Sequence, residues 1–195
     1  MILSANKILR RAQFEDVRIK YSKLGSWKNL KLVSYTDSSF KNSEDKVKSG
    51  GGRVSFLVNS QGLAIPLNWK SKTIQQVCKS VKSAETRSLE QGLADSIYTS
   101  RIISEIMTGK PGNKIPVVHR IHSKTLHDSI ISTKPIEEKT TRHLLAWIKQ
   151  QKDELNNISK IEWIPNTLML ADILTKKGVK ADSLLSVVMR GQLDS

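Results

Sequence analysis

Three acidic residues, far apart along the chain, have the side-chain type that binds divalent cations. Asp37 follows a β-branched and aromatic run, Glu85 lies in Ser-Ala-Glu-Thr, and Asp172 lies in the apolar stretch Leu-Ala-Asp-Ile-Leu. Carboxylate oxygens are the ligands that hard divalent ions prefer. A pair of such ions can activate water and stabilise the leaving oxygen of a phosphodiester. This chemistry is available to the chain if its fold brings the three acids together.

Each acid also has an ordinary structural explanation, so none of them indicates a site by itself. An aspartate at a strand end, such as Asp37, commonly forms a turn or a cap. A glutamate at the start of a helix, such as Glu85, interacts favourably with the helix dipole. Asp172 is the least easily explained, because it is expected in the middle of a helix among apolar residues.

Hydrophobic periodicity predicts the elements that would position these acids. The segment 31–40 is typical of a strand, and period-two alternation puts Val33, Tyr35 and Asp37 on the same side. A polar run followed by Gly50 to Gly52 predicts a turn. The pattern then predicts strands at 54–58 and 64–70, a helix at 83–107, a strand at 115–121, helices at 124–131 and 136–155, and a strand at 158–164.

The predicted order of elements favours an α/β fold. It suits a mixed five-stranded sheet, in which a three-stranded antiparallel meander is extended by two parallel strands and helices cover both faces. After Pro165 we expect a helix that carries Asp172 and ends at Gly178. A last amphipathic helix is expected to place one set of apolar residues on one face. This set is Ala181, Leu184, Leu185, Val188 and Met189.

The chain is expected to contain one domain with two short appendages. Residues 2–13 have the apolar spacing of a helix, and 15–29 resemble a linker broken at Gly25. We therefore expect an N-terminal helix and linker at 1–29, the domain at 30–178 and a C-terminal amphipathic helix at 179–195.

The composition indicates a polyanionic partner. Lysine and arginine number 32 against 18 acids, which gives a formal net charge of +14 and makes nucleic acid the leading candidate. A basic but inert surface is the alternative. No run approaches the roughly 18 apolar residues of a membrane helix. The single cysteine, Cys78, allows no intramolecular disulfide and fits an intracellular protein, cytoplasmic or nuclear, that is not secreted.

Basic residues near the loops around the three acids are candidates for contacts with phosphates, although solvated lysines are as common. These candidates are Lys70, Lys72, Lys124, Lys139 and Arg142. The tryptophans on predicted elements are expected to be buried or half-buried rather than to stack on bases. They are Trp69, Trp147 and Trp163.

Four sequence blocks occur in an order typical of one known family. They are Tyr-Thr-Asp at 35–37, Asn-Trp-Lys-Ser-Lys at 68–72, Ala-Glu-Thr at 84–86, and Trp-Ile-Pro at 163–165 with Leu-Ala-Asp-Ile-Leu-Thr-Lys at 170–176. From about residue 30 to 178 the chain resembles the ribonuclease H domain of a copia-type retrotransposon Pol polyprotein. Residues 4–9 resemble the end of the reverse transcriptase that precedes this domain, so the start at Met1 is expected to be a truncation.

The resemblance implies a ribonuclease H-like fold and a nuclease that hydrolyses the RNA strand of an RNA:DNA hybrid during reverse transcription. It implies two Mg²⁺ or Mn²⁺ ions, with Asp37 bridging them and Glu85 and Asp172 each helping to hold one. It also implies reverse transcriptase as a partner. The family's remaining metal-binding aspartate is missing, and His122 takes its place.

The histidine changes the expected metal chemistry. Magnesium prefers oxygen ligands, whereas imidazole suits zinc, copper or nickel and brings no negative charge. His122 could still bind manganese. We therefore expect an impaired nuclease, with a catalytically inactive remnant that binds nucleic acid or docks on reverse transcriptase as the alternative.

Overall fold

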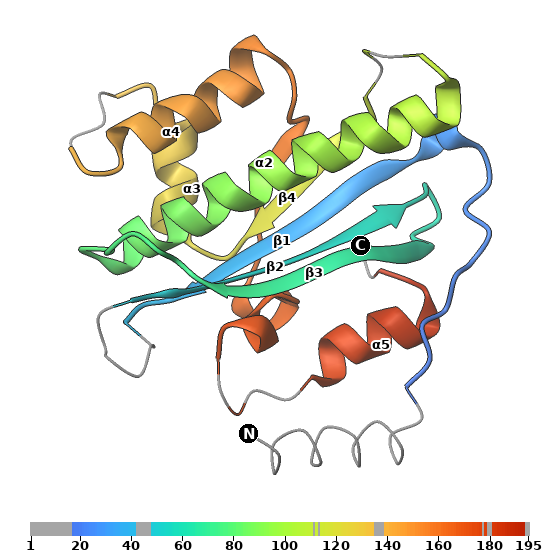
Figure 1. The fold of residues 1–195 in the computed structure, drawn as a ribbon, viewed down its shortest axis with the longest axis horizontal. Helices are drawn as coiled ribbons and strands as arrows, with labels where there is room; N and C mark the ends of the chain where they lie inside the picture. Colours follow the sequence, from blue (N-terminus) through green and yellow to red (C-terminus); the bar gives the residue numbers. More distant parts are fainter. Residues whose placement is uncertain are drawn as a thin grey trace.

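A five-stranded mixed sheet forms the centre of the molecule (Figure 1). The computed structural model describes residues 17–41, 48–110, 112, 114–134, 139–176, 178 and 181–193. The spatial order of the strands is β3-β2-β1-β4-β5, with β1–β3 antiparallel and β4 and β5 added in parallel. The strands are β1 (Lys31–Ser39), β2 (Gly50–Val58), β3 (Ala64–Thr73), β4 (Val117–Ile121) and β5 (Lys160–Trp163). The predicted sheet is confirmed.

Helices cover both faces of this sheet, as predicted. In Figure 1, α2, α3 and α4 lie on one face and α5 lies on the other. Their bounds are α2 (Val81–Thr108), α3 (Lys124–Ile131), α4 (Arg142–Lys149) and α5 (Asp182–Arg190), and a π-helical turn, Gln150–Glu154, follows α4. None of the helices in the described ranges has the length and apolarity needed to cross a membrane. The expected helix at 2–13 lies outside the described residues, and the three-part division of the chain stays a prediction.

The alternation of β1 separates two layers of the core. Val33 and Tyr35 point to the α5 face, where they pack in a cluster with Leu170 and Ala171. On the other face, Ser34 accepts a hydrogen bond from Ser96 of α2 at 2.8 Å. Small residues on the buried side of α2 let this long helix lie close to the sheet.

The segment after β5 differs from the prediction, because residues 164–176, all described by the structure, contain no α-helix. Two 3₁₀ turns, Asn166–Leu168 and Asp172–Leu174, replace the expected helix. Between them the consecutive residues Met169, Leu170 and Ala171 are all buried. An α-helix turns about 100° per residue, so it cannot direct three successive side chains into one flat layer. Asp172 therefore begins a short turn rather than lying in the middle of a helix.

The triple glycine also differs from the prediction. Gly50 to Gly52 are not a turn but the first residues of β2, and Gly52 pairs with Asp37 across the β1–β2 ladder. A Cβ atom on Gly52 would lie 2.8 Å from Leu174 Cβ and 3.1 Å from the carbonyl oxygen of Ala171. Glycine is needed here because the turn that carries Asp172 packs directly on the strand.

Candidate functional site

Asp37 lies at the centre of the candidate site, near the carboxyl end of β1. Its side chain is fully buried. Oδ2 accepts a hydrogen bond from the hydroxyl of Thr175, whereas Oδ1 accepts none. Burial raises the pKa of this carboxyl group, although Thr175 and His122 act in the opposite direction. A buried acceptor without a donor is suited to a cation, since the charged carboxylate is otherwise costly to bury.

His122 directly follows β4 and faces Asp37. Because β4 is parallel to β1, the carboxyl ends of both strands meet at one edge of the sheet. Nδ1 of His122 lies 3.3 Å from Asp37 Oδ1, and Nε2 lies 3.9 Å from Glu85 Oε1. The indole nitrogen of Trp163 donates to the carbonyl oxygen of His122 at 2.9 Å, which holds the backbone at this position.

Glu85 comes from the first turns of α2, behind the imidazole ring. Ser80 caps this helix by accepting from the amide of Ser83. Burial raises the pKa of the Glu85 carboxyl group, and a hydrogen bond with Ser123 opposes this shift. The ring of His122 thus lies between the carboxylates of Asp37 and Glu85.

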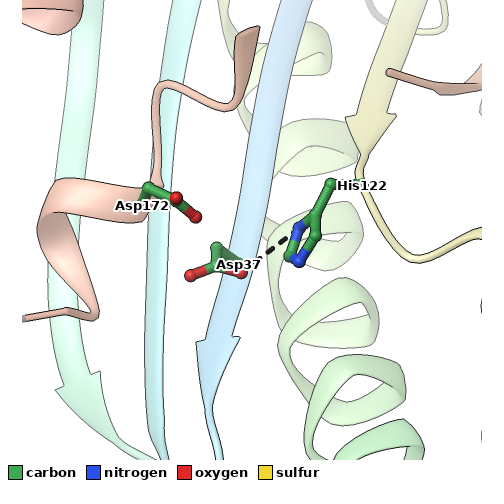
Figure 2. A group of neighbouring side chains, drawn as sticks. All are labelled: Asp37, His122 and Asp172. Atoms are coloured by element: carbon green, nitrogen blue, oxygen red, sulfur yellow. Dashed lines mark ion pairs between the residues drawn. The ribbon is translucent and has the colours of Figure 1, made fainter. Parts of the chain in front are cut away.

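Asp172 approaches from the other side of β1, on the turn that packs against Gly52. One ligand atom each of Asp37, His122 and Asp172 lie within 4.8 Å of one another (Figure 2). Figure 2 shows these side chains converging from β1, from the segment after β4 and from the turn. Lys176 donates to Asp172 Oδ1 at 2.8 Å. The fold therefore brings together residues from three distant parts of the sequence.

The structure places all four predicted site residues at this sheet edge, but their roles in metal binding stay predictions. Two further residues of the site, Thr175 and Lys176, were not assigned a role from the sequence. Lys176 follows Asp172 by four positions, a spacing that favours an ion pair and could have indicated this contact. No comparable sequence signal points to the bond between Thr175 and Asp37, because these residues are 138 positions apart.

A polar cavity of about 450 Å³ adjoins the site. It lies where β1 and β3 end beside the 3₁₀ turn, and Thr175 belongs both to its wall and to the site. Its other polar wall residues include Ser39, Ser71, Lys72 and Lys176. Two lysines and several hydroxyl groups in a concave surface are suited to binding phosphate oxygens.

All five candidate basic residues are exposed. Lys70 and Lys72 are exposed on β3, and Lys139 and Arg142 are exposed at and just before the start of α4. Lys124 begins α3, with its ammonium group 5.6 Å from the ring centre of Trp163.

Two tryptophans differ from the prediction. Trp69 is 57% exposed and Trp163 is 43% exposed, so neither belongs to the core. Trp69 lies in the middle of the edge strand β3, where the exposed half of this strand begins. Both flat side chains are therefore accessible to a ligand.

Comparison with known proteins finds similarity at the level of structure. No protein-family model matches the sequence, and no curated protein matches it significantly. The structure is similar to that of LC11-RNase H1, isolated from compost by a metagenomic approach. This comparison gives 18% identity and a TM-score of 0.53 over 74% of this chain and 92% of that one.

A second structure of LC11-RNase H1, in complex with an RNA/DNA hybrid, gives 20% identity and a TM-score of 0.53 over 74% of this chain and 94% of that one. The solution structure of the PFV RNase H domain has 14% identity and a TM-score of 0.47, covering 84% of this chain and 95% of that one. At these identities the similarity to LC11-RNase H1 shows the fold alone, which is ribonuclease H-like.

Proposed function

We propose that this chain is a ribonuclease H-type domain that binds RNA:DNA hybrid and hydrolyses the RNA strand at a reduced rate. One observation carries the proposal: ligand atoms of Asp37, His122 and Asp172 lie within 4.8 Å of one another at the edge of a ribonuclease H-like sheet. The four sequence blocks and the hybrid bound by LC11-RNase H1 support this substrate. The same blocks support an origin in a copia-type retrotransposon, with reverse transcriptase as partner and an intracellular setting.

Nucleic-acid binding is supported by charge and shape together. The formal net charge of +14 attracts a polyanion, and the cavity beside Asp37 offers Lys72 and hydroxyl groups to phosphates. Trp69, exposed on the strand that carries Lys70 and Lys72, adds a flat apolar surface to this strand. A strand lying along the end of β3 would pass over the cavity whose wall includes Thr175, the residue that donates to Asp37.

The donor set does not fit the pair of magnesium ions that the family implies. The carboxylates of Asp37, Glu85 and Asp172 suit a hard cation, and the unbonded Oδ1 of Asp37 favours one. His122, however, offers nitrogen where an oxygen is expected, and Lys176 already neutralises Asp172. We therefore expect hydrolysis to be weak with magnesium.

Cleavage of a labelled RNA:DNA hybrid tests the proposal. We expect slow cleavage by the unmodified chain, and at least tenfold faster cleavage with Mg²⁺ after His122→Asp, since this change restores an oxygen ligand. Asp37→Asn in the His122→Asp background should abolish the gain. His143→Asp is a matched control, because His143 is an exposed residue of α4 and does not belong to the cluster of Asp37, His122 and Asp172. Absence of cleavage by both the unmodified chain and His122→Asp would overturn the proposal.

A second candidate is a catalytically inactive module that keeps only nucleic-acid binding. It is favoured by the loss of one negative charge at His122 and the neutralisation of another by Lys176. In that case hybrid binding has a steep salt dependence, while Asp37→Asn changes no measurable property of the bound complex. Binding titrations at several salt concentrations, beside the cleavage assay, distinguish the two candidates.

A further inference from the structure

The spacing of Asp37 and His122 is that of two ligands on one metal ion. Nδ1 of His122 and Oδ1 of Asp37 are 3.3 Å apart. In a tetrahedral site with metal–ligand bonds of about 2.0–2.1 Å, neighbouring ligand atoms are separated by about 3.4 Å. An ion bound to both atoms would need no change in the distance between them. It would also satisfy the buried oxygen that accepts no hydrogen bond.

Asp172 offers a third ligand to the same ion. One ligand atom each of Asp37, His122 and Asp172 lie within 4.8 Å of one another, whereas neighbouring ligands of one tetrahedral ion are about 3.4 Å apart. The carboxylate of Asp172 must therefore move by roughly 1–1.5 Å to bind the same ion. The carboxylate is 13% exposed and sits on a short turn, where side-chain rotation can supply this shift. Two carboxylates and one imidazole leave a fourth position open, as catalytic zinc sites do.

The charge of the site matches one divalent ion better than two. The carboxylates of Asp37, Glu85 and Asp172 carry three negative charges when ionised, and Lys176 contributes one positive charge next to Asp172. The remaining two negative charges are balanced by a single divalent cation. A second cation would leave an excess of positive charge in a largely buried site, which is costly.

Glu85 is placed to orient His122 rather than to bind the ion. If Nδ1 binds a metal, Nε2 carries the proton, and Glu85 Oε1 is the carboxylate nearest to it at 3.9 Å. A small rotation brings these atoms to hydrogen-bond distance. Carboxylates commonly hold metal-binding histidines in this way, fixing the tautomer and the direction of the ring. Ser123 interacts with the same carboxylate and helps to position it.

We propose that Asp37, His122 and Asp172 bind one borderline divalent transition ion of the zinc class in preference to magnesium, with Glu85 orienting His122. The proposal rests on the proposed function only in placing a divalent ion at this site. Nearly every nitrogen-containing site binds zinc more tightly than magnesium, so the informative quantity is how the preference changes with residue 122.

Metal titration of the full chain without nucleic acid provides the test. Zinc affinity is measured by competition with a coloured chelator, and magnesium affinity by calorimetry. We expect one zinc ion per chain. His122→Asp should weaken zinc binding at least tenfold and tighten magnesium binding, while the matched control His143→Asp changes neither. The visible absorption of Co²⁺, which reports nitrogen ligation and coordination number, should change with His122→Asp and stay unchanged in the control.

The role of Glu85 is tested in the same titration. Glu85→Ala should weaken zinc binding about 10- to 100-fold. Glu85→Gln should recover much of this loss, because the amide oxygen can still accept from Nε2. Circular dichroism and thermal unfolding of each variant identify any loss that follows from misfolding.

Two results would overturn the inference. One is equal zinc affinity in the unmodified chain and in His122→Asp, and the other is a loss of zinc affinity in His143→Asp as large as the loss in His122→Asp. Its failure is distinguishable from that of the proposed function. Hybrid cleavage without His122-dependent zinc binding refutes the inference alone. Zinc binding that depends on His122, in a chain that does not bind hybrid, refutes the proposed function alone.

Discussion

The stability of this protein should depend on pH through one buried histidine, His119. This residue lies on β4 with no exposed surface. Its Nε2 is 3.0 Å from the hydroxyl of Thr36, and its Nδ1 has no hydrogen-bond partner. Burial lowers the pKa of His119 from 6.5 to about 3. No described carboxylate pairs with the ring, so protonation would place an uncompensated charge inside the protein.

The sign and size of the effect follow from linkage. Between pH 6.5 and about 3, the unfolded chain binds this proton and the folded chain does not. The free energy of unfolding therefore falls as the pH falls through this window, by about 1.4 kcal/mol per pH unit. At pH 4.5 the protein should have lost about 2.7 kcal/mol through His119 relative to pH 7.5. Such a loss is a large part of the stability of an ordinary domain.

Urea unfolding at pH 7.5 and 4.5, followed by circular dichroism, measures this loss. His119→Gln is the comparison, because glutamine can bond to Thr36 but does not titrate. Asp37 and Glu85 titrate in both proteins, so their contributions cancel in the difference. The unmodified chain should lose about 2.7 kcal/mol more than the variant. An equal loss in both would refute the reasoning, as would a nuclear magnetic resonance titration of the His119 ring with a pKa near 6.5.

Three other substitutions test the site. Gly52→Ala should reduce zinc affinity at least tenfold by displacing the turn beneath Asp172, as measured by chelator competition; unchanged affinity would contradict the packing argument. Asp37→Asn should raise the free energy of unfolding at pH 8 in urea titrations, because burial raises the pKa of this carboxyl group and makes its charged form costly to the fold; stabilising substitutions commonly contribute about 0.5–2 kcal/mol. The opposite sign would show that the charge stabilises the metal-free protein. Lys72→Ala should weaken hybrid binding and lower the slope of log affinity against log salt by about one. A slope equal to that of the unmodified chain would remove Lys72 from the interface.

The sheet could be predicted from the sequence because local pattern and long-range packing agree there. Val33, Tyr35 and Asp37 alternate along β1 as expected, so the side on which Asp37 lies follows from the pattern alone. The convergence of Asp37 and His122 then follows from parallel pairing of β1 with β4, a pairing that the long helical crossover of α2 favours.

The rest of the site could not be predicted because it depends on contacts between distant segments. Apolar residues around Asp172 satisfied a helical pattern, but burial of Met169, Leu170 and Ala171 in one layer overrides it. The glycines at the start of β2 are turn formers by composition, yet Gly52 serves close packing against the segment 171–175. Trp69 is exposed because no other segment buries this half of β3 in the described part of the chain. The local sequence pattern does not show which part of a strand other segments will bury.

The contact between Thr175 and Asp37 joins positions 138 residues apart. During synthesis, β1 leaves the ribosome long before the turn that completes the pocket has been translated. A nascent chain can therefore assemble its first three strands and α2 while lacking any complete ion-binding centre. A premature stop before residue 172 would remove Asp172 and Thr175, the donor to Asp37, together with the helix that covers one face of the sheet.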